Sequence, residues 1–346
     1  MSAGPVPAHR AEGVSAAWER LSGARRVILT THLNPDGDGV GTQAALLGLV
    51  GAAGGRATVV NPGPPPAGLR FLLADAPAVL DPRDAEAAER CREADLLVVV
   101  DTGARQRIGR VGRLVGHLPA LVIDHHPAGG RDGFGGQLLA DATAAATGEI
   151  VFDLVTHAGG PWSPGVVDGL YIAIMTDTGS FRFSNTSARV HRIAAELVER
   201  GADPARLWRN VYGRVPLRRI RLLEAVLPTL ELSDDGTVAW MTVPREAFRE
   251  LGCTTDDLEG LVDYPRGLDG VEVALLFREI RRGRVKVSLR STGAVDVNRV
   301  ASALGGGGHV KASGVFAEGA LDAVRERVLA LVSAATRATA TGGSVR

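Results

Sequence analysis

Short, continuously apolar runs alternate with segments of helical period through the first half of the chain. The apolar runs, rich in Val, Ile and Leu, lie at 26–31, 57–61, 96–101, 121–124 and 170–176. Continuous runs of this kind are typical of strands that are buried on both faces. Helical patterns occur between them at 41–50 and 142–156. The alternation predicts an α/β fold with a parallel sheet in the N-terminal part.

The second half of the chain has a different pattern. Charged helical segments at 187–200 and 204–228 precede a new set of apolar runs. The strands that we expect there are 238–243, 271–277 and 285–290, followed by helices near 297–304 and 321–335. We therefore predict an N-terminal domain over 20–200, a helical connector over 201–232 and a second, smaller α/β domain over 233–336.

The chain carries no overall charge that would attract a long polyanion. Its 346 residues include 39 basic and 39 acidic side chains, and aromatic residues make up only 4%. Neutrality disfavours electrostatic binding of long nucleic acid, and the scarcity of aromatic residues disfavours an extended base-stacking surface. Any nucleic-acid substrate should therefore be short. Lysine occurs only as Lys286 and Lys311, so a cationic site would consist mostly of arginine.

Cysteine content and hydropathy indicate a reduced, cytoplasmic protein. Cys91 and Cys253 are isolated and form no C-x-x-C motif. No apolar run reaches the roughly 18 residues of a membrane span, and the N-terminal segment lacks the apolar region of a signal peptide. We expect no membrane partner, and we expect the first dozen residues and residues 336–346 to be frayed.

Polar residues lie at the carboxyl ends of four of the apolar runs. These residues are His32, Asp36 and Asp38, then Asp101, then Asp124, His125 and His126, and finally Asp177. In an open parallel sheet, ligands bind beyond the carboxyl ends of the strands, where these side chains would meet. A single Asp after a strand is more often a turn residue or a helix cap. The repetition at four strand ends favours a shared ligand site.

The composition of this cluster favours divalent cations. Several carboxylates in one partly buried crevice repel one another unless a cation compensates them. A ligand set of His and carboxylate suits Mn²⁺ well and can also hold Mg²⁺, Zn²⁺, Fe²⁺ or Co²⁺. The carboxylates are more numerous than one ion needs. Two ions about 3.5–4 Å apart would clamp a phosphoryl group and generate hydroxide at neutral pH.

The glycines of the first motif permit a second interpretation, a dinucleotide-binding turn. Gly37, Gly39 and Gly41 follow a predicted strand and precede a predicted helix. Their spacing is G-x-G-x-G instead of G-x-G-x-x-G, and the next strand ends at Asn61 where an acidic ribose ligand would be expected. Two aspartates inside the loop would also repel a pyrophosphate. The pattern therefore disfavours a dinucleotide site, and we expect the glycines to leave room for ligands and substrate before a helix that starts near Thr42.

Taken together, the motifs resemble those of a known family. HLNPDGDGVGT, VVVDTG, VIDHH and MTDTGSF occur in the order found in DHH phosphoesterases, and SLRSTGAVDVNRVASALGGGGHVKASG resembles the DHH-associated domain. The resemblance extends from about residue 26 to about residue 332. It implies a metal-dependent phosphoesterase of the branch that degrades short oligoribonucleotides (nanoRNA, dinucleotides such as pApA) to mononucleotides and dephosphorylates 3′-phosphoadenosine 5′-phosphate. Some relatives hydrolyse cyclic di-AMP or its linear product.

The resemblance also implies roles for individual residues. His32 and Asp36 would hold a first metal ion, and Asp101 would bridge it to a second one. The ligands of the second ion would be completed by Asp38, His125 and Asp177. His126 would contact the scissile phosphate and Asp124 would orient the histidines. The family further implies two divalent ions, with Mn²⁺ expected first and Mg²⁺ or Co²⁺ as alternatives, and a homodimer.

The second domain carries the candidate substrate-binding residues. In the strand 285–290, alternation places Val285, Val287 and Leu289 on one face and Lys286, Ser288 and Arg290 on the other. Arg290 could contact a phosphate through two N–H groups, and the glycine run 305–308 could form an anion-binding nest or merely a hinge. The full candidate set is Arg290, Ser291, Gly306, Gly307, Gly308 and His309.

Two further functions remain open beside the leading hypothesis. Pyrophosphate or polyphosphate hydrolysis would use the same metal ligands in related enzymes. A non-catalytic nucleotide sensor would keep the fold but usually lacks a metal ligand, and here every ligand of the family pattern is present. The expected partners are short RNA oligonucleotides and nucleotide bisphosphates as substrates, with no long nucleic acid.

Overall fold

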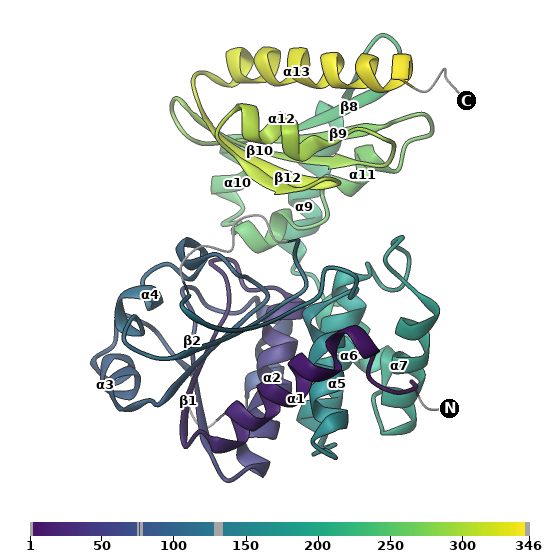
Figure 1. Cartoon of the computed structure of the whole chain (residues 1–346). Helices are drawn as coiled ribbons and strands as arrows, with labels where there is room; N and C mark the ends of the chain where they lie inside the picture. Colours follow the sequence, from purple (N-terminus) through teal and green to yellow (C-terminus); the bar gives the residue numbers. More distant parts are fainter. Residues whose placement is uncertain (1–2, 75, 77–78, 128–133, 343–346) are drawn as a thin grey trace. The chain divides into compact units, whose positions relative to one another are not determined.

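The computed structural model describes residues 3–74, 76, 79–127 and 134–342 (Figure 1). The chain divides after Arg214 into two compact units. The expected connector 201–232 is split by this division, because α8 (Pro204–Val211) lies in unit 1 and α9 (Leu217–Val226) lies in unit 2. Among the described residues, no helix is long and apolar enough to cross a membrane. Cys91 and Cys253 are both free thiols.

Unit 1 is a parallel sheet with helices on both faces. Its strands are β1 (Arg26–Thr30), β2 (Arg56–Val60), β3 (Val79–Leu80), β4 (Leu96–Val100), β5 (Ala120–Asp124) and β6 (Gly136–Ala140). Its helices besides α8 are α1 (Ala8–Gly23), α2 (Gly37–Ala52), η1 (Ala67–Leu73), α3 (Ala85–Glu93), η2 (Arg105–Ile108), α4 (Val111–Leu114), α5 (Thr147–His157), α6 (Pro164–Asp177) and α7 (Ala188–Glu199).

The strand order of this sheet is β3-β2-β1-β4-β5-β6, and every neighbouring pair is parallel. The order reverses direction between β1 and β4. In open parallel sheets such a reversal is where ligands bind. The predicted α/β fold is therefore confirmed. The four strands expected from the apolar runs are present, and β3 and β6, which lack such runs, were not predicted.

Alternate residues of the central strands enter two separate cores. Val98 and Val100 of β4 pack in the larger core with α2, α5 and α6, whereas Leu97 and Val99 pack in a smaller core with α3 and α4. All five residues of β4 are buried. Burial on both faces explains why the strands read as continuous apolar runs.

The expectation that 170–176 is a strand was wrong. These residues form the second half of helix α6, which Ser163 and Pro164 begin. The helix is buried on nearly every side, because it packs on α2 and α5 as well as α7. A buried helix and a doubly covered strand both have uninterrupted apolar sequence, so periodicity could not distinguish them. Asp177 consequently lies at the carboxyl end of a helix.

Helix α2 begins earlier than predicted, because Asp36 caps it. The Asp36 carboxylate accepts a hydrogen bond from the Gly39 N–H at 3.1 Å, and the helix starts at Gly37 instead of near Thr42. The glycines do not leave room for substrate as expected. A Cβ atom on Gly41 would lie 2.3 Å from the carbonyl oxygen of Gly169 in α6, so Gly41 allows the two helix backbones to touch. A Cβ atom on Gly37 or Gly39 would overlap the side chain of Thr176 or Thr31.

The N-terminal segment is ordered from Ala8 onward, which corrects the expectation of fraying over the first dozen residues. Arg10 of α1 is buried, with 4% of its surface exposed. Its guanidinium lies 2.5 Å from Asp141, 2.8 Å from Asp153 and 3.5 Å from Glu149, all of them buried carboxylates. The composition of the segment suggested fraying. The ion pairs that order it join residues far apart in the sequence, so composition could not reveal them. Residues 1–2 lie outside the described residues.

Unit 2 is a mixed sheet between two sets of helices. Its strands are β7 (Glu231–Leu232), β8 (Val238–Val243), β9 (Val273–Arg281), β10 (Arg284–Ser291), β11 (Gly307–His309) and β12 (Ala312–Glu318). Its helices besides α9 are η3 (Leu227–Thr229), α10 (Arg245–Glu250), η4 (Thr255–Leu258), α11 (Asp263–Arg266), α12 (Val297–Ala303) and α13 (Leu321–Gly342). Helix α13 extends past the predicted end, so 336–342 is helical and not frayed, and 343–346 lie outside the described residues.

The second sheet has the order β11-β12-β10-β9-β8-β7, with β8 and β9 parallel and the other pairs antiparallel. Helices α12 and α13 cover one face and α9 to α11 pack against the other (Figure 1). Val285, Val287 and Leu289 point into the first of these cores, as the alternation of β10 predicted. The mixed sheet confirms the smaller α/β domain, although β11 and β12 were not predicted.

We predict that Arg10→Met lowers the free energy of unfolding by roughly 3–5 kcal/mol, because it leaves buried carboxylates without their cation. Urea denaturation followed by far-UV circular dichroism measures this change. Arg20→Met, on the same helix, is the matched control, because Arg20 forms no ion pair with any described residue. Equal stabilities of the two variants would show that the buried pairing contributes nothing.

Candidate metal centre

The polar residues predicted to meet do so at the point where the strand order of unit 1 reverses. Thr31 and His32 follow β1, and Asp101 follows β4, which is the neighbour of β1 in the sheet. Asp124 is the last residue of β5. Helices α2 and α6 contribute Asp38 and Asp177. The crevice at such a reversal is where open parallel sheets bind their ligands.

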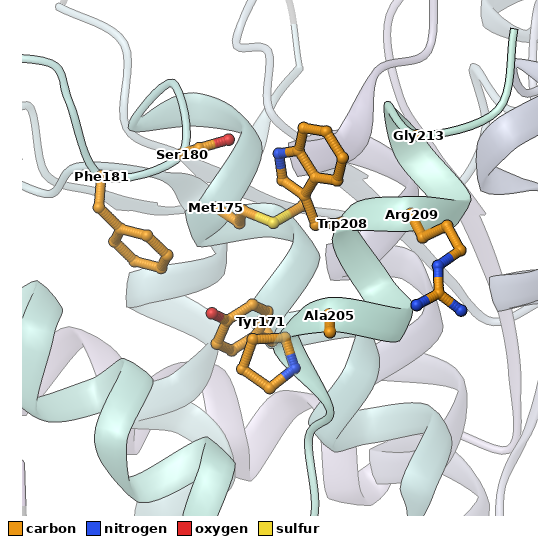
Figure 2. Close-up of a pocket in the computed structure, with 9 residues that line it drawn as sticks. Tyr171, Met175, Ser180, Phe181, Ala205, Trp208, Arg209 and Gly213 are labelled. Atoms are coloured by element: carbon orange, nitrogen blue, oxygen red, sulfur yellow. The ribbon is translucent and has the colours of Figure 1, made fainter.

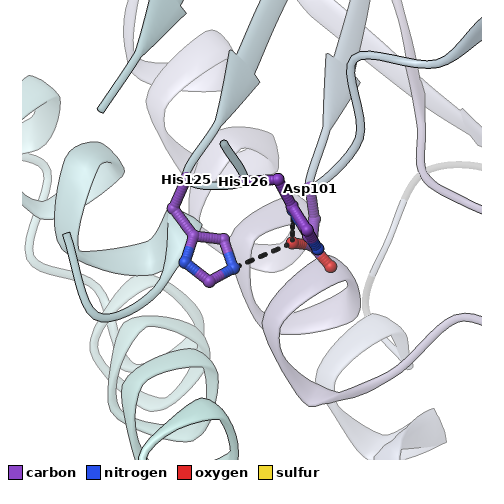
Figure 3. A group of neighbouring side chains, drawn as sticks. All are labelled: Asp101, His125 and His126. Atoms are coloured by element: carbon purple, nitrogen blue, oxygen red, sulfur yellow. Dashed lines mark ion pairs between the residues drawn. The ribbon is translucent and has the colours of Figure 1, made fainter. Parts of the chain in front are cut away.

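Three overlapping sets of side chains offer ligand atoms that all lie within 4.8 Å of one another. The sets are His32, Asp36 and Asp101; Asp38, His125 and Asp177; and Asp101, His125 and His126. In Figure 3 the imidazoles of His125 and His126 both approach one oxygen of Asp101, at 3.5 Å and 3.6 Å. Asp101 therefore lies in contact with both halves of the cluster.

The first half of the cluster is organised around His32. Its Nε2 atom lies 3.1 Å from Asp101 and 3.4 Å from Asp36. Asp36 is held in place by its role as the cap of α2. Asp101 has φ of 60°, in the left-handed region that Asp, Asn and Gly tolerate better than other residues. The backbone conformation aims this carboxylate at His32 and the other imidazoles.

The second half is organised around His125. Its Nε2 atom lies 3.1 Å from Asp177, 3.5 Å from Asp101 and 3.8 Å from Asp38. Its Nδ1 atom lies 3.4 Å from the carbonyl oxygen of Ala144, which can only accept a hydrogen bond. Nδ1 therefore carries the proton, and Nε2 can offer a lone pair to a cation among the carboxylates.

His126 is held by Asp124. The Asp124 carboxylate accepts hydrogen bonds from the Nδ1 atom of His126 at 2.7 Å and from its backbone N–H at 3.1 Å. Burial favours a higher pKa for Asp124, but the hydrogen bonds and charge of His126 outweigh it and lower this pKa. An ionised Asp124 fixes the orientation of the His126 ring.

A segment that the sequence analysis did not single out supports the cluster from behind. The backbone N–H groups of Thr147 and Gly148, at the start of α5, donate to Asp38 at 2.6 Å and 2.9 Å. The Thr147 hydroxyl lies 3.3 Å from Asp101. A helix N-terminus stabilises negative charge. Most of these donors are backbone groups, which a pattern of side chains does not reveal. The one signal in the sequence was Thr-Gly-Glu, which lies at the start of α5.

The carboxylates of the cluster are poorly compensated by the protein alone. Burial, followed by the charge of Asp177, raises the pKa of Asp38 to about 7. Burial and the neighbouring carboxylates also raise the pKa of Asp101 well above its usual range. Burial opposes protonation of His125, but Asp177 and the other carboxylates raise the pKa of its imidazole to about 10. The cluster therefore draws in positive charge.

These residues fit divalent cations. Four carboxylates, of Asp36, Asp38, Asp101 and Asp177, converge with imidazoles, and two of the carboxylates hold protons more strongly than normal. Cations would relieve this repulsion, and a set of oxygen and imidazole ligands without sulfur is compatible with Mn²⁺, Mg²⁺ or Co²⁺. The ligand set therefore suits the divalent cations that the sequence predicted for this cluster.

A separate cavity lies beside the carboxyl half of α6. It has a volume of about 650 Å³ and is lined by Tyr171 and Met175 of α6, by Ser180 and Phe181, and by residues of α8 that include Trp208 (Figure 2). None of the described residues that line it is a histidine or carries a carboxylate. Its mostly apolar surface therefore distinguishes it from the metal cluster.

The candidate substrate residues lie in unit 2. Arg290 is half-buried and its guanidinium donates to the Leu289 carbonyl oxygen at 3.0 Å. Ser291 is buried, with its hydroxyl 3.5 Å from the Gly293 carbonyl oxygen. His309 is exposed at the end of the short strand β11, which forms one edge of the sheet.

The glycine run forms part of the edge of the second sheet, and its predicted contact with an anion stays a prediction. Gly307 and Gly308 belong to β11, which pairs with β12, and Gly305 forms a turn with φ of 80°. A Cβ atom on Gly306 would lie 2.4 Å from the Gly314 carbonyl oxygen. Gly306 and Gly308 leave no room for a side chain, because the backbone of β12 lies close to both.

Nearly the whole chain is similar to known proteins. Residues 26–174 match the DHH family, N-terminal domain, and residues 235–335 match the DHHA1 domain. The bifunctional oligoribonuclease and PAP phosphatase NrnA of Thermus thermophilus is 35% identical, over 91% of this chain and 94% of its own. The protein of the same name from Bacillus subtilis is 27% identical, over 83% of this chain and 88% of its own.

One solved structure is similar in fold as well as in sequence. It is the crystal structure of an exopolyphosphatase-related protein from Bacteroides fragilis, with a TM-score of 0.84 at 26% identity. The match covers 94% of this chain and 95% of that protein. Both halves of the chain thus have counterparts in relatives that the chain covers almost entirely.

We predict that Asp101→Asn abolishes the thermal stabilisation that Mn²⁺ gives to the protein. The raised pKa of Asp101 means that metal-free protein loses stability as pH rises through that pKa. In chelator at pH 8 the variant should therefore unfold at the same temperature as the unaltered protein or higher. Adding Mn²⁺ should raise the unfolding temperature of the unaltered protein alone. An equal rise in both would contradict a metal contact at Asp101.

Proposed function

Because the chain belongs to the DHH family of phosphoesterases, we propose that it hydrolyses short oligoribonucleotides to mononucleotides and dephosphorylates 3′-phosphoadenosine 5′-phosphate. The cluster of His and Asp side chains at the reversal of the sheet is the observation that carries this proposal. The matches to relatives that are named for these two activities extend over most of this chain and most of each relative. This similarity supports the proposal.

We assign two divalent metal ions, with Mn²⁺ as the first expectation, to this cluster. His32 and Asp36 would hold one ion, and Asp38, His125 and Asp177 would hold the other, with Asp101 shared. When bound, such ions polarise a phosphoryl group and lower the pKa of coordinated water. Asp38 is positioned for its part by the N–H groups of Thr147 and Gly148, and His125 by the Ala144 carbonyl.

The chain's own residues orient the substrate and carry protons. His126 is assigned the contact with the scissile phosphate through Nε2, because Asp124 occupies Nδ1. A donor held in this way stabilises charge that develops on the phosphoryl oxygens. Arg290 and the edge strand Gly307–His309 are assigned to the distal part of the substrate. Hydrolysis by this route requires no covalent intermediate on the protein.

The physiological setting follows from the same assignments. We propose that the substrates are short RNA and nucleotide bisphosphates and that the enzyme acts in the cytoplasm. The formal net charge of zero supports a short substrate, since a long polyanion would need a broad basic surface. A homodimer is proposed on the family resemblance alone.

A second candidate is the hydrolysis of pyrophosphate or polyphosphate. The similar structure from Bacteroides fragilis is described as exopolyphosphatase-related, which favours this candidate. Cyclic di-AMP is a further candidate substrate, because its phosphodiester bonds suit the same ligand set. The assigned residues of unit 2 would be of little use to an enzyme acting on inorganic phosphates, so we place pyrophosphate and polyphosphate after short RNA.

We predict that the purified protein with Mn²⁺ releases mononucleotides from di- to pentaribonucleotides and phosphate from 3′-phosphoadenosine 5′-phosphate. A panel with long RNA, linear and cyclic di-AMP and pyrophosphate, each with Mn²⁺ or chelator, separates the candidates. Asp101→Asn is the inactive control. Intact short oligonucleotides after prolonged incubation would refute the proposal, and faster turnover of pyrophosphate than of a dinucleotide would favour the second candidate.

We predict that Asp124→Asn lowers kcat on a dinucleotide by about 10–100-fold, because His126 loses its charged partner. KM and the Mn²⁺ affinity measured by calorimetry should change little, since Asp124 is not among the assigned metal ligands. Asp81→Asn, at an exposed ion pair in unit 1, serves as the control. An equal loss of Mn²⁺ affinity would instead place Asp124 among the ligands.

A further inference from the structure

A row of cationic and aromatic side chains crosses the sheet of unit 2 on the face that carries Arg290. Phe316 of β12, Lys286 of β10 and Arg278 of β9 are directly opposite one another in the strand register. Residues opposite each other in neighbouring strands share a face. This row lies on the face opposite to the core formed with α12 and α13, because Val285 and Val287 occupy that core.

The two cations of the row have no acidic partner among the described residues. Neither Arg278 nor Lys286 forms an ion pair, and the Nε–H of Arg278 is buried without a hydrogen-bond acceptor. Burial lowers the pKa of both groups, and the charges acting on Lys286 are those of Arg290 and Arg278, which lower it further. Positive charge held together in this way favours an anion.

The backbone of β12 is shaped to accept the lysine side chain. A Cβ atom on Gly314 would lie 2.7 Å from the Lys286 Nζ atom, so a larger residue there would displace the ammonium group. The ammonium lies 4.4 Å from the centre of the Phe316 ring. The ring itself is 51% exposed, so part of its surface can contact a ligand.

The row continues the cationic face of β10. Lys286 and Arg290 are four residues apart on one strand, which separates their Cα atoms by about 13 Å. Two cations at this spacing can contact different phosphates of one chain. Exposed aromatic rings beside such cations are the elements with which proteins bind single-stranded nucleic acid.

We propose that Lys286 and Arg278 form an anion site for a phosphate of the short RNA substrate, with the Phe316 ring beside it for contact with a nucleobase. The site is additional to Arg290 and the edge strand, and it rests on the proposed function. It would favour substrates that carry a second phosphate over a single phosphomonoester.

Two variants of the full-length protein test this site, with a matched control. Lys286→Met keeps the hydrocarbon stem and removes the charge, and Arg278→Gln removes the guanidinium. Arg282→Gln is the control, because Arg282 is exposed in the hairpin between β9 and β10. Fluorescence anisotropy in chelator measures binding of a 3′-labelled, 5′-phosphorylated tetraribonucleotide, with inorganic phosphate as competitor. Thermal unfolding verifies that each variant is folded.

We expect each site variant to weaken tetraribonucleotide binding on the order of tenfold. The slope of the logarithm of the binding constant against the logarithm of salt concentration should become shallower by about one. With Mn²⁺, KM for the tetraribonucleotide should rise while kcat stays within about twofold, and Arg282→Gln should change neither. Unchanged binding of the tetraribonucleotide in both folded variants would overturn the inference. Variants that bind the tetraribonucleotide normally but no longer respond to competing inorganic phosphate would overturn it as well.

The same measurements separate this inference from the proposed function. Hydrolysis of short RNA with normal KM in both site variants would sustain the proposed function and reject the anion site. Absence of hydrolysis with weakened binding in the site variants would reject the proposed activity while retaining the anion site as a nucleotide-binding surface.

Discussion

The direct contact between the backbones of α2 and α6 positions the rest of the candidate metal centre. Gly41 and Gly169 face each other so closely that a Cβ atom on either would overlap the carbonyl oxygen of the other. The start of α2 carries Asp36 and Asp38, and the end of α6 carries Asp177. Larger residues at the contact would separate the helices and move these carboxylates apart.

Negative charge at the centre is balanced in two layers. Cations and imidazoles would compensate the carboxylates that face the crevice, whereas backbone N–H groups of α5 compensate Asp38 from the interior. The start of α5 is itself held by Glu149, which accepts a hydrogen bond from the Ala145 N–H, and Glu149 is paired with Arg10 and Arg189. The position of Asp38 thus depends indirectly on the N-terminal helix.

The sequence was informative where side chains follow a regular pattern along the chain. It predicted the parallel sheet, the smaller second domain and the convergence of the polar residues, all of which follow from apolar periodicity and the strand ends. It could not identify α6 as a helix, because burial on nearly all sides removes the helical period of polar residues. It also missed Thr147 and Gly148, whose contribution comes from backbone groups.

The error at the N-terminus has a physical cause. Ala and Gly suggested fraying, but composition reports local preference and not what a residue contacts in the tertiary structure. Arg10 is ordered by carboxylates more than 130 positions away. Local preference was overridden there by long-range packing.

The left-handed backbone at Asp101 determines which residue types can stand there. Most side chains are strained at φ of 60°, and Asp is one of the few that combines tolerance of this conformation with a charge. Backbone geometry and ligand chemistry therefore select the same amino acid independently. An alanine at this position would combine strain with loss of charge, whereas asparagine changes the charge and leaves the backbone relaxed.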